Sequence, residues 1–278
     1  MKKRFRAVLL SLGFLFLLAQ PAFAAELGEP NITPQTKMEE IRSNPSIVGA
    51  GIYTYSLDQD RALDRLYWDA QPLSCLSNHW TAQDAADGLN YLIRTYNAGQ
   101  QVTFPLYTAE EIAQDTSRDG VELYYMPTEN AQPNQKYVLV IGGNAIVVSA
   151  EIREGISTAW NLHEMGYPVN TFLEFEPLYN VLLDTGVCQQ RYYKMTLSDY
   201  ITPDYPPTYH WCGKNDLTLM SMCWWAQGPV LEKALARNGV AHIYHVYDNA
   251  PHAVGAGKGT DAEGWLNEAV AFWEEQVG

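Results

Sequence analysis

The second half of the chain alternates apolar segments with helical ones, and this alternation constrains the fold more than any other feature. Residues Tyr137–Ile141 form an unbroken apolar run, which is typical of a strand buried on both faces of a parallel sheet. Helices are predicted at residues 154–165, 224–238 and 261–276, and further strands at residues 169–173, 207–211 and 241–247. Strand and helix in turn predict an α/β fold with a mostly parallel sheet and crossover helices.

An accessory segment is predicted before this α/β part. The spacing of apolar residues predicts helices at residues 38–42, 81–97 and 109–114, followed by a strand at residues 121–126. A polar, proline-containing loop at residues 130–135 marks a boundary. The predicted organisation is therefore an N-terminal accessory segment over residues 25–135 and an α/β domain over residues 136–278.

The first 24 residues have the pattern of a secretory signal peptide. Four basic side chains precede the apolar run Ala7–Leu18, and Ala22-Phe23-Ala24 supplies a small-residue cleavage site. The pattern predicts an exported protein, extracellular or periplasmic, that is cleaved near Ala24. The alternative is an uncleaved N-terminal anchor, although the apolar run is short for a bilayer span.

The charge balance indicates which partners the chain does not bind. Asp and Glu number 32 against 18 Lys and Arg, so the formal net charge is −14. Nucleic acids and anionic membrane surfaces attract proteins with a basic face, and neither is expected as a partner of this chain. The sequence does not determine the oligomeric state.

Export permits disulfides, and the chain has four cysteines, Cys75, Cys188, Cys212 and Cys223. Four cysteines allow three complete pairings, among which the sequence does not choose. Cys212 and Cys223 flank one loop and are the first candidates for a bridge. No CxxC pair is present, so no zinc or redox site is predicted.

Polar and glycine residues follow the ends of three predicted strands. Gly142, Gly143 and Asn144 follow the first of these strands, while Asp216 and His252 lie a few residues beyond the two later ones. Ligands of open α/β sheets bind beyond the carboxyl ends of the strands. A glycine turn, an acid and a histidine are therefore expected at one edge of the sheet.

The order of these motifs resembles the α/β-hydrolase family, in particular secreted bacterial esterases of the acetyl-esterase or dienelactone-hydrolase type. The resemblance covers about residues 121–276 and rests on several short motifs in the same order. These are Ile141-Gly142-Gly143-Asn144-Ala145, Glu154-Gly155, Gly166-Tyr167, the segment from Pro206 to Asp216, Gly239-Val240 and Pro251-His252.

The resemblance implies a shortened α/β-hydrolase fold and hydrolysis of a carboxylic ester through an acyl-enzyme. Asp216 matches the acid and His252 the base of the catalytic triad. Gly142 and Gly143 match the oxyanion turn, in which Asn144 replaces the usual third glycine. The implied substrate is a small-molecule ester or an acylated carbohydrate, and this chemistry needs no cofactor and no metal.

The sequence has no G-x-S-x-G motif to supply a serine nucleophile. Residues 174–206 also leave too little chain for the family's nucleophile strand and its flanking helices, because one βαβ unit alone takes ~30 residues. Cys188, in Gly186-Val187-Cys188-Gln189-Gln190, is the candidate nucleophile. The alternative for Cys188 is a buried or disulfide-bonded cysteine. The alternative for the whole chain is a non-catalytic pseudoenzyme or binding module that keeps the edge of the pocket.

The chain also has 18 tyrosines and 8 tryptophans. Two interpretations stay open for them, packing in an aromatic-rich core or a carbohydrate-binding surface. His210, His242 and His245 lie within strand patterns without metal-ligand spacing, which favours packed or surface side chains.

Overall fold

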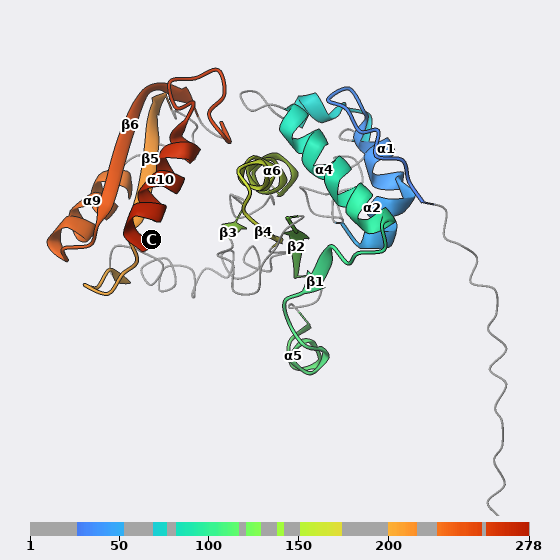
Figure 1. The fold of residues 1–278 in the computed structure, drawn as a ribbon, viewed down its shortest axis with the longest axis horizontal. Coiled ribbons are helices and arrows are strands. Elements are labelled where there is room, and N and C mark those ends of the chain that lie inside the picture. Colours follow the sequence, from blue (N-terminus) through green and yellow to red (C-terminus); the bar gives the residue numbers. More distant parts are fainter. Residues whose placement is uncertain are drawn as a thin grey trace, which may run out of the picture.

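The computed structural model describes residues 27–52, 69–76, 82–116, 121–128, 138–141, 151–173, 200–215, 227–251 and 254–277. The predicted signal peptide lies outside these ranges. Within them the chain combines helices with two sheets, and this mixed α/β composition agrees with the predicted class (Figure 1). No helix in the described part of the chain is long and apolar enough to cross a membrane.

The larger sheet has four strands in the order β1-β2-β4-β3. They are β1 (Thr103–Pro105), β2 (Glu122–Met126), β3 (Val138–Ile141) and β4 (Val169–Leu173). β2 is antiparallel to both of its neighbours, whereas β3 and β4 are parallel. A crossover through α6 (Ser157–Glu164) separates β3 from β4, as a parallel pair requires.

The smaller sheet is the parallel pair of β5 (Thr208–Asn215) and β6 (His242–Pro251), connected through α9 (Gln227–Arg237). Together the two sheets contain two antiparallel and two parallel pairings. The prediction of a mostly parallel sheet is therefore wrong for the described residues. The reason is the orientation of β2, which runs against both of the strands that it pairs with.

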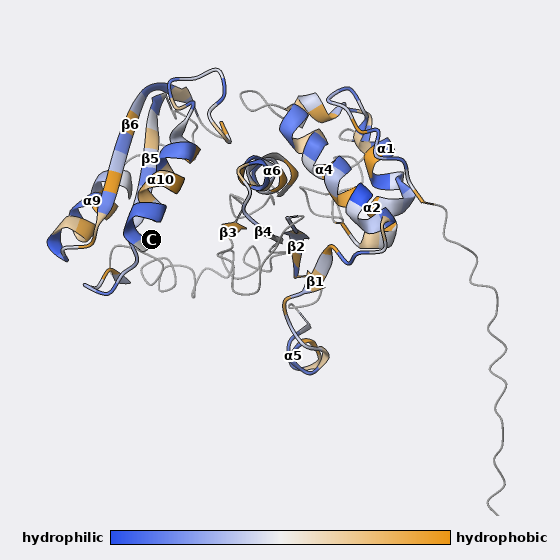
Figure 2. Cartoon of the chain, viewed as in Figure 1, coloured by the Kyte–Doolittle hydropathy of each residue, from blue (hydrophilic) through white to orange (hydrophobic). Residues whose placement is uncertain are grey.

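The main core joins residues from both sides of position 135, where the sequence predicts a boundary. Helix α4 (Ala82–Asn97) contributes Leu89, Leu92 and Ile93, all fully buried. Residues of α6, of β3 and β4, and Leu266 of α10 (Trp265–Val277) belong to the same core. Figure 2 shows hydrophilic and hydrophobic residues interspersed along α4, in keeping with its amphipathic pattern.

Several elements agree with their predicted ranges and others do not. α1 (Met38–Ser43), α4, α5 (Ala109–Gln114), β2 and β4 lie where they are predicted. Sequence patterns miss α2 (Pro45–Ala50), β1 and a short 3₁₀ turn at Leu73–Leu76. The helix predicted from residue 154 begins with a π-helical segment, Glu151–Ile156, which continues into α6.

Candidate active site at the ends of strands β5 and β6

Strands β5 and β6 end side by side, and this is where two of the predicted catalytic residues follow in the chain. The parallel register runs from Thr208 opposite His242 to Gly213 opposite Tyr247, and after an irregularity Asn215 lies opposite Pro251. Asp216 and His252 are the next residues of the two strands. Both lie outside the described residues, as do Gly142, Gly143, Asn144 and Cys188.

The strand that leads to the predicted oxyanion turn belongs to the larger sheet. β3 ends at Ile141, opposite Phe172 of β4, and among the described residues it has no pairing with β5 or β6. The described strands therefore bring the chain positions before the acid and the base together. Ile141, the residue before the glycine turn, belongs to a different sheet among the described residues.

Gly213 permits the irregular register at the end of β5. A Cβ atom at this buried glycine would overlap the carbonyl oxygen of Ala250 on β6 and lie 2.7 Å from its carbonyl carbon. Residues 213–215 contain glycine and asparagine, which favour turns, so the sequence predicts that they lie beyond the strand. They continue β5 instead, because the backbone of β6 supplies pairing as far as Pro251.

Charged side chains flank this edge of the pair. Lys214 of β5 forms an ion pair with Asp248 of β6, and the hydrogen bond to Asp248 raises the pKa of Lys214. Both side chains are well exposed, at 61% and 70%. The backbone N–H of Asn249 donates to the Asp261 carboxylate over 2.9 Å, which ties β6 to the segment that follows His252.

That segment, residues 254–264, is the glycine loop. Four of its glycines, at positions 255, 257, 259 and 264, have positive φ, a conformation that residues with a side chain adopt only at a cost. Its internal hydrogen bonds include Thr260 Oγ1 to the Gly257 carbonyl (2.7 Å) and Gly259 N to a Glu263 carboxylate oxygen (3.0 Å). These turns delay the last helix, predicted from residue 261, until Trp265.

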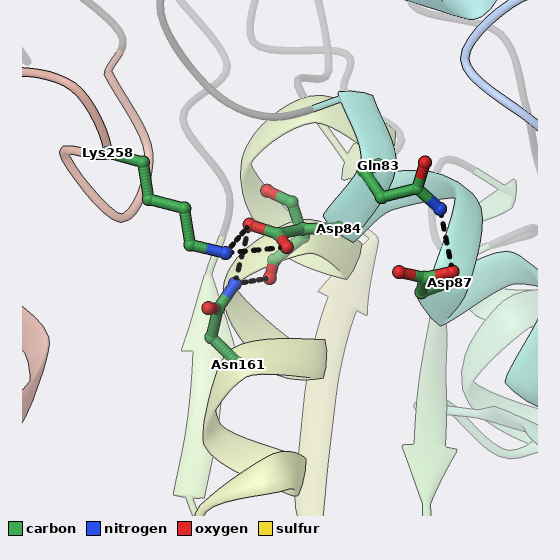
Figure 3. Close-up of polar contacts among 6 residues, drawn as sticks. Gln83, Asp84, Asp87, Asn161 and Lys258 are labelled. Atoms are coloured by element: carbon green, nitrogen blue, oxygen red, sulfur yellow. Dashed lines mark hydrogen bonds and ion pairs between the residues drawn. The ribbon is translucent and has the colours of Figure 1, made fainter.

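An acid–base cluster attaches the glycine loop to α4 (Figure 3). Lys258 Nζ lies 2.7 Å from both carboxylate oxygens of Asp84. Asn161 of α6 donates from Nδ2 to Asp84 Oδ2 over 3.1 Å and to the Ser157 carbonyl over 2.8 Å. The Asp84 carboxylate therefore holds three segments together, namely α4, α6 and the loop that follows His252.

Two features of the structure stabilise a charge on the Asp84 side chain of α4. Asp84 is in the first turn of the helix, where the backbone N–H groups give the helix terminus a partial positive charge. Its side chain is only 11% exposed, and Lys258 and Asn161 supply the donors that a buried carboxylate needs. Asp84 is not part of any motif that predicts a site residue. An acid one helical turn from Gly88 and two from Leu92, on an otherwise apolar stripe, is the signal that could have identified it.

We predict that Lys258→Met lowers the free energy of unfolding by about 2–3 kcal/mol, because it removes a cation from the buried Asp84 carboxylate. The matched control is Lys37→Met, which removes a pair to Glu39 between side chains that are 51% and 54% exposed. Such an exposed pair contributes less than about 1 kcal/mol. Urea unfolding measures both changes, and equal losses in the two variants would contradict a structural role for the pair of Asp84 and Lys258.

The Cys212 side chain on β5 shows that the disulfide prediction is wrong. Cys212 is a free thiol whose Sγ atom lies 3.1 Å from the Tyr244 hydroxyl, so it does not form the bridge to Cys223 that its loop position suggested. Cys75 is also free, and it is exposed.

The His210 ring stacks on Tyr244, with the ring centroids 4.5 Å apart. Burial is the larger cause that lowers the pKa of His210, and the charge of His242 is the smaller one. In the described part of the chain no three His, Cys, Asp or Glu side chains are grouped to hold a metal.

Comparisons with protein-family models, with curated proteins and with solved structures find no match to this chain. A functional proposal therefore rests on the residues themselves and on the way in which the described strands place them.

Proposed function

We propose that the chain is a carboxylic-ester hydrolase of the α/β-hydrolase type, with Asp216 and His252 as acid and base beyond the ends of β5 and β6. One observation carries this proposal, the parallel register in which Asn215 lies opposite Pro251. Neighbouring strands are ~4.8 Å apart, so residues that directly follow such a pair start from the same edge within reach of each other. An acid that orients a histidine needs that proximity.

The order of the larger sheet also supports the proposal. In α/β-hydrolases the first four strands have the order 1-2-4-3 with the second strand antiparallel, and β1 to β4 have this order here. The strand that would carry the nucleophile belongs between β3 and the pair β5–β6. The chain between β4 and β5 lies outside the described residues up to Tyr200 and includes Cys188.

In the proposed reaction, His252 takes the proton of the Cys188 thiol while Asp216 holds the imidazole in the required tautomer. The thiolate attacks the ester carbonyl carbon, and backbone N–H groups at Gly142 and Gly143, beside Asn144, stabilise the oxyanion. The alcohol leaves with the proton from His252. Water, deprotonated by the same imidazole, then cleaves the thioester to release the acid and restore the thiol.

The proposed substrates are small-molecule esters, including acylated carbohydrates, and the proposed reaction consumes no cofactor. We also infer export with cleavage near Ala24, because four basic residues and an apolar run precede a small-residue cleavage pattern. N-terminal sequencing of the secreted protein tests that inference directly.

Hydrolysis of p-nitrophenyl acetate tests the proposed function. We expect the chain without residues 1–24 to exceed the buffer rate, and Cys188→Ser to lose most of that activity because a serine needs stronger activation than a thiol. Cys75→Ser is the control, since Cys75 is an exposed free thiol at a distance in the sequence from the proposed triad. A rate no higher than that of buffer would instead favour the binding-module alternative, and equal rates in Cys188→Ser and the unmodified chain would exclude Cys188 as the nucleophile.

A further inference from the structure

One face of the pair β5–β6 gathers five aromatic rings, which we call the aromatic face. It consists of Tyr209 and Trp211 from β5, His245 and Tyr247 from β6, and Trp265 from the first turn of α10. In the parallel register Trp211 lies opposite His245, so the two side chains project to the same side of the sheet. The ring centroids of Trp211 and Tyr247 are 5.3 Å apart, and those of Trp211 and Trp265 are 5.7 Å apart.

Hydrogen-bonding groups lie among these rings. The Tyr209 hydroxyl donates to a Glu268 carboxylate oxygen over 3.0 Å and lies 3.4 Å from the Tyr247 hydroxyl. His245 Nε2 is 3.4 Å from the same carboxylate oxygen. Burial, with the hydrogen bonds to Tyr247 and Glu268, raises the pKa of Tyr209, so the phenol stays protonated and keeps its donor.

The aromatic face differs from the surface of an ordinary parallel pair. Strands of parallel sheets are usually apolar on both faces because helices cover them, whereas Figure 2 shows β6 mostly in blue and pale colours. All five rings are half-buried rather than enclosed, while the side chains of His245 and Glu268 are 44% and 57% exposed. Aromatic rings with a wet polar rim are characteristic of binding surfaces.

We propose that the aromatic face binds a neutral carbohydrate, with a sugar ring stacked on Trp211 and its hydroxyl groups bonded to Glu268, Tyr209 and His245. The C–H groups of a sugar ring are weakly positive and pack against the negative face of an aromatic ring. A carboxylate, a phenol and an imidazole supply both acceptors and donors for sugar hydroxyls. The net charge of −14 favours a neutral ligand over an acidic one.

This site does not depend on the proposed esterase activity, because its residues lie on a face of the sheet and not at the strand ends. A chain without hydrolytic activity can still bind sugar here, and an active one can fail to do so. The two tests are therefore separate.

The experiment titrates the ¹⁵N-labelled protein with neutral hexasaccharides, xylohexaose and cellohexaose, while the indole N–H signals of the eight tryptophans are followed. We expect the Trp211 and Trp265 signals to shift with a dissociation constant of about 1 mM. Trp211→Ala should weaken binding at least ~10-fold, and Glu268→Gln, on an exposed side chain, ~3-fold. Phe104→Ala, a 37% exposed ring on β1, is the matched control and should leave the affinity unchanged.

Polygalacturonate, an acidic polysaccharide, should not shift these signals. The proposal is overturned if neither hexasaccharide moves the Trp211 and Trp265 signals, or if Glu268→Gln and Trp211→Ala both bind as tightly as the unmodified chain. A second copy of the chain that covers the aromatic face would also overturn the proposal. Sedimentation would detect it as a dimer that sugar does not dissociate. Insoluble xylan as a second probe shows whether a free oligosaccharide or a polymer is the better ligand.

Discussion

His252→Ala is expected to slow the hydrolysis of p-nitrophenyl acetate by ~10³-fold, the effect of losing a general base. In the proposed reaction His252 accepts the nucleophile's proton and returns it to the leaving alcohol, so its loss would impair both halves of the reaction. The measurement is kcat/KM for the chain and the variant at the same protein concentration. Asp216→Asn should also lose activity, because an amide cannot stabilise the imidazolium.

The control for this prediction is His242→Ala at the other end of β6. His242 bonds through Nδ1 to the Val240 carbonyl over 2.7 Å and lies opposite Thr208, at the start of the parallel pair. The His242→Ala variant should hydrolyse the ester at the same rate as the unmodified chain. If His242→Ala and His252→Ala lose activity equally, the effect is one of folding. If neither loses activity, His252 is not the base.

Gly213→Ala is expected to lower the free energy of unfolding by about 3 kcal/mol or more. The added methyl group meets backbone atoms of Ala250 on the neighbouring strand, and backbone cannot rotate away as a flexible side chain can. The two strands must therefore separate at their last paired residues, which shortly precede Asp216 and His252 in the sequence. Urea unfolding measures the loss.

Gly259→Ala separates this clash from the general cost of replacing glycine. Gly259 has a φ of 78°, and an added Cβ meets no atom within 4 Å, so only the left-handed backbone conformation opposes the change. That conformation costs ~1–2 kcal/mol for a residue with a side chain. A loss in Gly213→Ala no larger than in Gly259→Ala would show that β5 and β6 adjust to the methyl group without strain.

Local patterns predicted those elements whose signals are contained in a few neighbouring residues. The stripe of apolar residues predicts α4, and glycines 99, 166 and 239 end helices in the left-handed conformation that their positions require. The continuation of β5 through Gly213 depends on the backbone of β6, which lies more than 30 residues later. No local pattern contains that information, and the same holds for the orientation of β2.

For the candidate site, local patterns predict only the strand ends that precede Asp216 and His252. Strand ends point to Asp216 and His252 because parallel strands share one carboxyl edge. The pair of Asp84 and Lys258 joins residues 174 positions apart, and neither residue forms a motif with its sequence neighbours. Only the fold brings these two side chains together, so the attachment of the glycine loop to α4 could not be inferred from spacing.

The packing of α10 against the main core has a consequence for how the chain acquires its structure. Leu266 belongs to the main core, to which α4 contributes, and near the C-terminus Glu274 accepts a hydrogen bond of 2.7 Å from Tyr167. A ribosome that has synthesised the first 250 residues has thus not yet supplied the last part of that core. Contacts between such distant positions slow folding. The main core of a nascent chain is therefore incomplete until Leu266 has been added.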